Sequence, residues 1–177
     1  MRAPRTEDLR EFVALRQASR AFLEPWEPAE PDGTDRFSER WAARFLAPAK
    51  SERRAAFLIC ASDDGKLLGA LSFFHIERGA VQSAQVGYWV GAAHADRGVM
   101  GRALELALAK AFGSLELQRV EALIVPENEP SRRLVQRTGF QLEGLARGYA
   151  ELGGRRRDHE RWSLTRAEWL AKRERSR

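Results

Sequence analysis

The sequence has one cysteine, three scattered histidines and no long apolar run. The single cysteine, Cys60, excludes an internal disulfide and a zinc site built from several thiolates. No stretch approaches the ~18 apolar residues of a membrane-spanning helix, and the N-terminal segment MRAPRTEDLREF lacks the apolar core of a signal peptide. We therefore expect a cytoplasmic protein that binds no metal and makes no contact with a membrane.

The composition is that of a globular chain. Of its 177 residues, 44% are hydrophobic and 31% are charged, which suits one sizeable core and predicts a single domain over residues 1–177. The net charge of +5 comes entirely from residues 147–177, where ten Lys and Arg face five Asp and Glu, because the preceding residues balance. Such a basic tail is typical of a solvated surface, and it is the only segment that suggests contact with nucleic acid.

Hydrophobic periodicity predicts a mixed α/β fold. Two helices separated by a proline-rich loop come first, and an antiparallel meander of three strands follows. Strand and helix then alternate, and a hairpin closed by Gly153 and Gly154 precedes a terminal helix. The expected helices are 6–23, 34–47, 101–115, 130–139 and 167–177, and the expected strands are 54–62, 66–77, 81–90, 119–126, 140–152 and 155–165. Gly87, inside the third strand, indicates a bulge or the close approach of a ligand.

The segment GYWVGAAHADRGVMGRAL places a strand, a glycine-containing loop and a helix in direct succession. A helix N-terminus presents unpaired amides and the positive end of the helix dipole, which suit a phosphate. Gly98 and Gly101 let the backbone approach such a group, and Arg97 and Arg102 add positive charge. The segment matches neither the GxxxxGK(S/T) loop nor GxGxxG, so nucleoside triphosphates and nicotinamide cofactors are disfavoured. Alternatively, this segment is an ordinary turn between a strand and a helix that binds no phosphate.

A second segment, VPENEPSRRLVQRTGF, places Asn128 and Ser131 at the start of a short helix that Gly139 closes. Both residues are of types that commonly cap a helix N-terminus, and capping alone would explain them. Alternatively, the two side chains face a cleft that opens where two parallel strands part.

Together, in this order and at this separation, the two segments resemble those of the GNAT acetyltransferase superfamily. The resemblance extends to its RimJ/RimL-like branch, the N-terminal alanine acetyltransferases of ribosomal proteins. The matching segments are RAPRTEDLREF, SRAFLEPWEP, GYWV with DRGVMGRAL, RVEALIVPENEPSRRLVQRTGFQLEG and GGRRRDH. The resemblance implies an α+β fold whose mixed sheet splays apart at its centre. It also implies that acetyl-CoA lies in the splay, with its pyrophosphate on the loop around Gly98.

The same resemblance implies roles for individual residues. Ser131 would protonate the leaving thiolate, Asn128 would hold the pantetheine arm or a water molecule, and Glu151 would be the general base. A backbone amide near Trp89 and Val90 would polarise the thioester carbonyl. The implied cofactor site comprises Trp89, Val90, Asp96, Arg97, Gly98, Val99, Met100, Gly101, Arg102, Asn128 and Ser131.

The chain departs from the family pattern at several places. The pyrophosphate loop of the family usually reads Gln/Arg-x-x-Gly-x-Gly/Ala. Ala95, Gly98 and Met100 stand at those positions, and only Gly98 matches. The tyrosine that many members carry shortly before a Gly-Phe pair is absent here, which leaves Ser131 as the acid. The family's first strand also looks shortened, and a one-residue shift at Glu151 would turn its side chain to the other face of its strand.

The acceptor amine is cationic, and residues 21–35 hold five carboxylates and no cation. The resemblance implies that the acceptor groove borders this segment. Trp26 would then be a wall of the groove, Glu24 or Glu27 a charge partner, and Tyr149 a further wall from the hairpin. Packing alone would equally explain Trp26 and Tyr149.

Asp158 and His159 look like a catalytic pair because they are adjacent in the sequence. Adjacent residues on a strand point to opposite faces, so these two cannot act together as a dyad. We therefore expect His159 to be structural.

Three functions are compatible with these residues. An α-amine has a pKa of ~7.7–8.0 and is partly neutral at cellular pH, so it needs no strong base. We therefore expect direct transfer of an acetyl group from acetyl-CoA to the N-terminal α-amine of a protein, in particular a ribosomal one. The alternative acceptor is a small amine such as an antibiotic or a polyamine. A third reading, supported only by Arg155–Arg157 and Ala95, is an RNA- or ribosome-binding module that has lost catalysis.

Overall fold

The computed structural model describes residues 1–47 and 52–175 of the chain. Its helices are α1 (Leu9–Ala18), α2 (Arg20–Leu23), α3 (Glu39–Leu46), α4 (Val99–Phe112), α5 (Glu129–Thr138) and α6 (Arg166–Arg175). Its strands are β1 (Ala55–Cys60), β2 (Leu67–Glu77), β3 (Ser83–Val90), β4 (Arg119–Ile124), β5 (Gln141–Leu152) and β6 (Arg155–Thr165). Every expected strand is present. The last two residues of the expected terminal helix lie outside the described residues.

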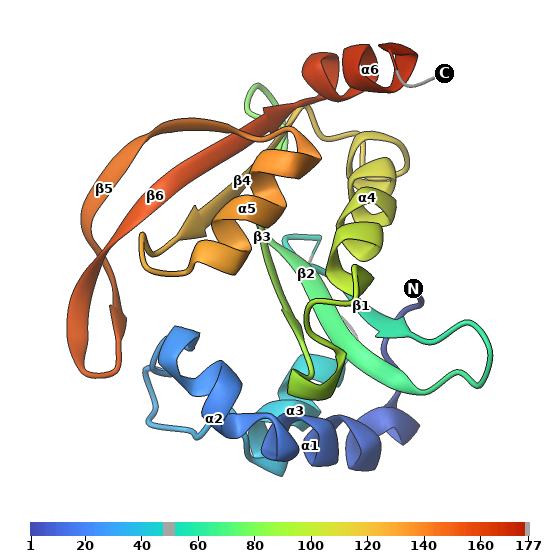
Figure 1. Ribbon diagram of the computed structural model, residues 1–177, viewed down its shortest axis with the longest axis vertical. Helices are drawn as coiled ribbons and strands as arrows, with labels where there is room; N and C mark the ends of the chain where they lie inside the picture. The colour runs from blue at the N-terminus through green and yellow to red at the C-terminus, as the bar shows by residue number, and fades with distance from the viewer. Residues whose placement is uncertain (48–51, 176–177) are drawn as a thin grey trace.

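The described strands form one mixed sheet in the order β1-β2-β3-β4-β6-β5 (Figure 1). β1, β2 and β3 pair antiparallel, as the expected meander does. β3 and β4 are parallel, and β4, β6 and β5 pair antiparallel again. At the β1 edge, Arg2 and Leu58 form an isolated antiparallel bridge in place of a longer first strand. The expected mixed sheet is confirmed, and its parallel pair lies at the centre.

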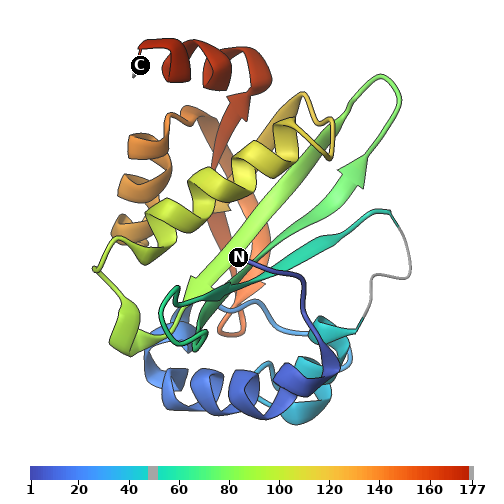
Figure 2. The same ribbon diagram turned by 90° about the vertical axis from the view of Figure 1, so that its right-hand side faces the viewer.

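Helices cover both faces of the meander. Leu58 of β1 and Ala70 of β2 belong to a core shared with α1 and α3, whereas their neighbours Ile59 and Leu71 belong to a core shared with α4. Successive side chains of a strand point to opposite faces, so these are two cores on the two sides of one sheet. Figure 2 shows α4 lying over the strands and running along them, with α1 at their lower end.

The first helix is shorter than expected because it breaks at Ser19, whose φ of −105° and ψ of 8° are not helical. The hydroxyl of Ser19 accepts a hydrogen bond from the backbone N–H of Ala92, at 3.0 Å. The break therefore ties the N-terminal helices to the loop between β3 and α4. The second helix starts only at Glu39 because Ser38 caps it, accepting a hydrogen bond from the N–H of Trp41.

The bulge expected at Gly87 is absent. Gly87 pairs with Ser72 in a regular ladder, and the irregularity lies between Phe74 and Glu77, where His75 has a φ of +50°. A β-carbon on Gly87 would lie 3.0 Å from Cε1 of Phe74. The prediction of a bulge is therefore wrong, whereas the close approach of a ligand stays a prediction. The Phe74 ring leaves little room for a β-carbon at this position.

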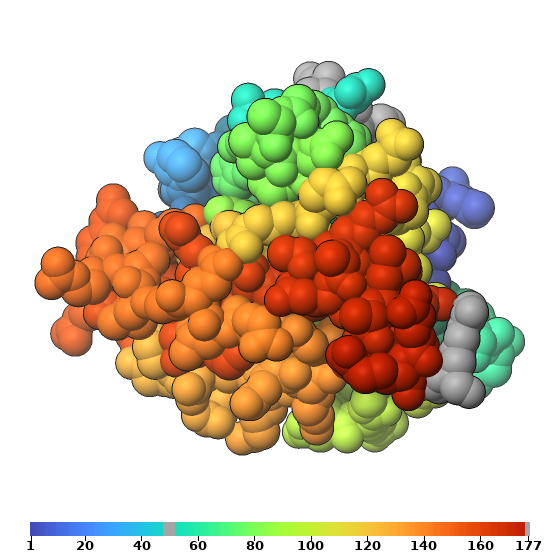
Figure 3. All heavy atoms as spheres, turned by 90° about the horizontal axis from the view of Figure 1, so that it is seen from above, coloured from blue at the N-terminus to red at the C-terminus, as the bar shows by residue number. Residues whose placement is uncertain are grey.

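The C-terminal hairpin turns at Gly153 and Gly154, as expected, and both have positive φ. Part of the basic tail has a role within the protein. Lys172 donates to the carbonyl oxygens of Arg137 and Thr138, each at 2.8 Å, and so satisfies the C-terminal end of α5. Figure 3 shows α6 and the hairpin strands together on one face of the molecule.

Candidate active site

The parallel strands β3 and β4 part along their length. They pair only over Ser83–Gln85 and Arg119–Glu121. β3 continues to pair with β2 as far as Val90, and β4 with β6 as far as Ile124, but no described pairing joins β3 to β4 beyond Gln85. The inner edges of the resulting V present backbone N–H and C=O groups with no partner from the facing strand. The central splay that the resemblance implies is confirmed.

A cleft of about 1140 Å³ occupies the splay. Its walls come from β2, β3 and the end of β4, from the first turns of α4 and α5, from α2 and the turn after it, and from the β5–β6 hairpin. Small-molecule pockets have volumes of about 300–1,000 Å³. The cleft therefore has room for a long cofactor and part of a second molecule.

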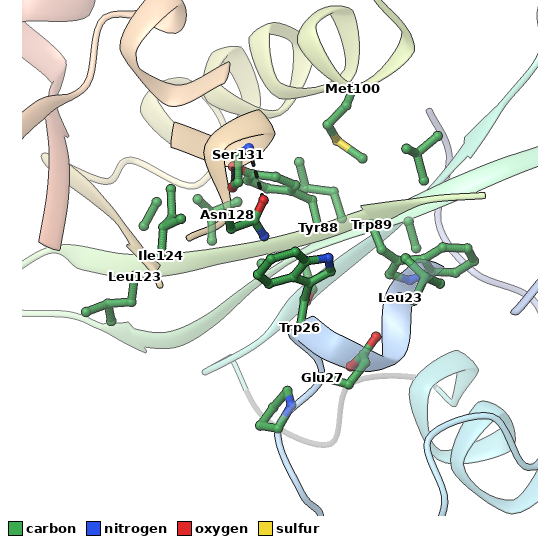
Figure 4. A pocket seen from close by; sticks show the side chains of 18 of the residues that line it. Leu23, Trp26, Glu27, Tyr88, Trp89, Met100, Leu123, Ile124, Asn128 and Ser131 are labelled. Atoms are coloured by element: carbon green, nitrogen blue, oxygen red, sulfur yellow. Dashed lines mark hydrogen bonds between the residues drawn. The ribbon is translucent and has the colours of Figure 1, made fainter. Parts of the chain in front are cut away.

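Tyr88, Asn128 and Ser131 lie together in the cleft (Figure 4). Asn128 caps α5 by accepting a hydrogen bond from the backbone N–H of Ser131, at 3.2 Å. Asn128 therefore both caps the helix and lines the cleft. The hydroxyl oxygens of Tyr88 and Ser131 are 2.8 Å apart. Burial raises the pKa of Tyr88 to about 12, so at neutral pH the phenol keeps its proton and can donate it to Ser131. The proton of Ser131 is then free for another acceptor.

The loop between β3 and α4 fits an anion. Asp96 and Gly98 have left-handed backbone conformations, with φ of +57° and +73°, and no side chain caps α4 at Gly98. A β-carbon on Gly98 would meet no atom within 4 Å, and one on Gly101 would touch only Leu134, at 3.8 Å. The first amides of α4 therefore border open space, where a helix N-terminus binds phosphate well. The residues present fit the pyrophosphate of a coenzyme A molecule.

The expected cofactor residues divide into two groups. The cleft lining includes Trp89, Val90, Asp96, Gly98, Val99, Met100, Gly101, Asn128 and Ser131. Arg97 and Arg102 are exposed and lie outside that lining, so their charge can act only from the rim. Met100 also packs against the α4 core, which gives the departure from the family pattern at this position a packing role.

At the opposite end of the cleft, arginines neutralise the acidic segment. Glu27 binds Arg16 at 2.6 Å and Arg36 at 3.0 Å. Glu30 binds Arg36 at 2.6 Å and Arg44 at 3.0 Å. The remaining carboxylates of residues 21–35 are paired as well: Glu24 and Asp35 with Arg20, and Asp32 with Arg40 and Arg44. Glu27 lines the cleft but is held by two guanidinium groups, and Glu24 does not line it.

Arg16 is the most deeply buried charge of this region, with 1% of its side chain exposed. Its guanidinium carbon lies 4.6 Å from the ring centre of Trp41 and 4.9 Å from that of Trp89. Burial lowers the pKa of Arg16, and the charge of Glu27 opposes that shift. The guanidinium group of Arg16 keeps its charge, so its burial depends on the counter-charge of Glu27.

Of the residues expected at the acceptor side, the two aromatic side chains line the cleft and Glu151 does not. Trp26 and Tyr149 line the cleft, and each is more than a third exposed, as groove walls would be. The hydroxyl of Tyr149 lies 3.3 Å from the side-chain amide of Gln85. Glu151 is exposed, pairs across the hairpin with Arg156 and does not line the cleft.

Two residues of the site, Tyr88 and Arg16, are not predicted from the sequence. Tyr88 lies within the quoted GYWV segment, but only the fold brings it to Ser131, 43 residues away. Arg16 did carry a signal, because it shares the buried side of the first helix with Phe12 and Ser19 at helical spacing. A charge in the buried stripe of a helix indicates a partner elsewhere in the fold.

Among the described residues, no cluster of three His, Cys, Asp or Glu side chains could hold a metal ion. No helix in the described part is long and apolar enough to cross a bilayer. Cys60 is partly buried and packs against the core under α1 and α3.

Known proteins with similar sequences are acetyltransferases. Residues 1–141 match the family described as "Acetyltransferase (GNAT) domain". The probable N-acetyltransferase YjcK of Bacillus subtilis is 32% identical over 155 residues, which cover 86% of each chain. The ribosomal protein uS5-alanine N-acetyltransferase of Escherichia coli is 29% identical over 154 residues, covering 85% of this chain and 79% of that protein.

Solved structures share the fold over nearly the whole chain. RimJ of Mycobacterium smegmatis, in complex with CoA-disulfide, is 33% identical with a TM-score of 0.81, covering 94% of this chain and 81% of that one. Spermidine N-acetyltransferase of Vibrio cholerae, in complex with CoA and spermine, has a TM-score of 0.77 over 96% of each chain. At 22% identity, that second likeness shows the fold alone. The family match and the relatives agree with the splayed sheet and its cleft, and this chain belongs to the GNAT acetyltransferases, which use acetyl-CoA as acetyl donor.

Proposed function

We propose that this protein transfers the acetyl group of acetyl-CoA directly to the N-terminal α-amine of a protein, and that the acceptor is a ribosomal protein. The observation that carries the choice of acceptor is that arginines pair all five carboxylates of residues 21–35. The relative that acts on an alanine of ribosomal protein uS5 supports the same choice. Such an acceptor also implies a cytoplasmic location.

Three groups in the cleft would act on the reacting atoms. A backbone amide near Trp89 and Val90, on the unpaired edge of β3, would donate to the thioester oxygen as it gains charge. Ser131 would give its proton to the departing thiolate while the phenol of Tyr88 donates to the oxygen of Ser131. Asn128, held in place by its capping bond, would hold the pantetheine arm. Positioning of the two substrates would supply much of the remaining acceleration.

A polyamine is the less favoured acceptor. A chain with several ammonium groups needs several free carboxylates, and here those at the acceptor end already balance arginines. A peptide N-terminus brings one ammonium group, and Trp26 and Tyr149 offer it a partly exposed apolar groove. The fold shared with a spermidine N-acetyltransferase keeps the polyamine as the second candidate.

A binding module without catalysis has less support still. Arg157 pairs with Glu127 at 2.6 Å, and Arg156 donates to the carbonyl oxygen of Tyr149 at 3.2 Å. These arginines therefore take part in contacts within the protein. Any contact of the basic tail with ribosomal RNA would help to bind the acceptor and would not replace the transfer reaction.

Acetylation assays with mass spectrometry would separate the acceptors. We expect peptides that begin with alanine, taken from the N-termini of ribosomal proteins, to gain a single acetyl group on the α-amine. Spermidine and an aminoglycoside at equal concentration should react at least tenfold more slowly. Faster turnover of spermidine than of every peptide would contradict the proposal and favour the polyamine reading.

Replacing Gly101 with alanine should separate stability from cofactor binding. The new methyl group meets only Leu134, at ordinary contact distance, and alanine favours a helix over glycine by up to ~1 kcal/mol, so the free protein should melt slightly higher. The affinity for acetyl-CoA should fall, because the methyl group stands where the backbone meets the pyrophosphate.

Differential scanning fluorimetry with and without acetyl-CoA measures both effects. At ~100 times the dissociation constant, ligand stabilises the wild type by ~2.7 kcal/mol, a rise of roughly 5–10 °C for a domain of this size. Gly98→Ala is the matched comparison, because the positive φ at that position strains any residue with a β-carbon, so the free variant should melt lower. An unchanged ligand-induced rise in Gly101→Ala would place the pyrophosphate elsewhere.

A further inference from the structure

His159 lies on the cleft side of β6. It is 6% exposed and lines the cleft. Its neighbour Glu160 points to the other face of the strand, where it binds Arg132 of α5 at 2.8 Å. Because successive side chains of a strand point to opposite faces, His159 lies on the face of β6 that is turned away from α5.

The hairpin is held close to the catalytic cluster. Arg157, two residues before His159, binds Glu127 at 2.6 Å, and Glu127 directly precedes Asn128, the cap of α5. His159 therefore enters the cleft from β6, while Ser131 enters it from α5. A basic group and an acidic group thus line the same cleft from two different elements.

A hydrogen bond sets the tautomer of the imidazole. Nδ1 of His159 lies 3.1 Å from the carbonyl oxygen of Arg157. A carbonyl only accepts, so Nδ1 must carry the hydrogen, and Nε2 of the neutral ring has a free lone pair. In the described part of the chain, the fully buried side-chain polar atoms that lack a hydrogen-bond partner belong to Arg16, Arg36 and Trp89. Nε2 of His159 has no hydrogen-bond partner among the described residues and is not one of these fully buried atoms. It is therefore open to the cleft that His159 lines.

The surroundings keep the ring neutral. Burial lowers the pKa of His159, and the charge of Arg157 adds to that shift. The hydrogen bond to the carbonyl oxygen of Arg157 and the charges of Asp158 and Glu127 oppose it, but the net direction is downward. The carboxylate of Asp158 accepts a hydrogen bond from the N–H of Gly148, at 2.7 Å. From β5, the Tyr149 ring packs on the imidazole, with ring centres 5.2 Å apart.

We infer that His159 is the general base that takes a proton from the acceptor amine, directly or through one water molecule. The inference rests on the proposed function and replaces the expectation that His159 is structural. The ammonium group gives one proton to Nε2, and the imidazolium passes it to solvent. The amine lone pair then forms the C–N bond as the C–S bond breaks, and Ser131 gives its proton to the departing thiolate. The second amine proton leaves the nitrogen for Nε2 of His159, now neutral again, or for water, and a proton from solvent restores the hydroxyl of Ser131.

The test is the pH profile of His159→Asn with an alanine-initiated peptide. Asparagine can keep a donor near the position of Nδ1 but has no counterpart of Nε2. At pH 7 about a tenth of an α-amine of pKa ~8 is neutral without help, so we expect the variant to lose about tenfold in kcat/KM. Above pH 9 the amine is neutral by itself, and the variant should approach the wild type. In the wild type, kcat/KM should fall in acid as the imidazole becomes protonated.

Two controls keep the roles apart. Ser114→Ala, at an exposed serine outside the cleft lining, should leave the pH profile unchanged. Ser131→Ala should be slow at every pH, because it lacks the acid. A defect in His159→Asn that is equal at pH 7 and pH 9.5, or no defect at all, would overturn the inference while peptide acetylation by the wild type still supports the proposed function. A wild-type protein that acetylates only spermidine would overturn both.

Discussion

Ser131→Ala is expected to lower kcat about 100-fold while leaving the KM for acetyl-CoA nearly unchanged. A positioned general acid contributes ~10²–10⁴ to a rate, and we take the lower end because water can reach a cleft this open. The proposed cofactor site extends to the first turn of α4, so loss of one hydroxyl should not weaken binding of acetyl-CoA. Steady-state kinetics that vary acetyl-CoA at a saturating peptide concentration measure both quantities.

Tyr88→Phe tests the hydroxyl pair from its other side. The variant keeps the ring and loses only the hydrogen bond to Ser131, which spans 2.8 Å. A neutral hydrogen bond contributes ~1 kcal/mol, so kcat should fall about fivefold. Ser114→Ala, at an exposed serine that lies outside the cleft lining, is the control and should behave as the wild type. If Ser131→Ala kept full kcat, the thiolate would have to take its proton from another group.

Glu27→Ala is expected to destabilise the fold by about 3–5 kcal/mol, the usual cost of leaving a buried charge without its partner. Arg16 is almost fully buried and Glu27 is its carboxylate partner, so the substitution leaves a guanidinium group inside the protein without a counter-charge. The substitution also removes a partner of Arg36. Urea denaturation followed by circular dichroism gives the change in the free energy of unfolding.

Glu24→Ala is the matched control because Glu24 pairs with Arg20 on the surface. Exposed ion pairs contribute little to stability, so this variant should unfold like the wild type. The comparison also tests whether Glu27 is structural or an acceptor ligand. A Glu27→Ala protein that is as stable as the wild type but has a raised KM for peptide would instead support Glu27 as a charge partner of the acceptor amine.

Local patterns predicted most of the fold. The alternation of apolar residues, the glycine pair at 153 and 154 and the cap at Asn128 each act over a few residues, and each is found where it was expected. Failures occurred where a distant contact overrides a local preference. The helix breaks at Ser19, whose hydroxyl binds the distant N–H of Ala92, and at Gly87 the ladder is regular and the ring of Phe74, from the neighbouring strand, lies close.

The site divides in the same way. The chemistry of the β3–α4 loop depends on a helix N-terminus and on glycine, which are local, so the sequence predicted an anion site there. The acceptor end depends on long-range ion pairs and could not be predicted. Residues 21–35 hold five acidic side chains and no cation, yet arginines from α1, α3 and the segment before α3 neutralise them.

By itself, the sequence determined the family, through segments that resemble it, and the mixed α/β fold, and it placed a glycine-containing loop before a helix, since all three are expressed in the order of neighbouring residues. Only the tertiary structure decided which polar groups are free to act. It joins Tyr88 to Ser131, pairs Glu27 with Arg16, moves Glu151 away from the cleft and leaves His159 open to it. The physical reason is that a side chain is available for chemistry only when no other group satisfies it, and those groups come from segments far apart in the chain.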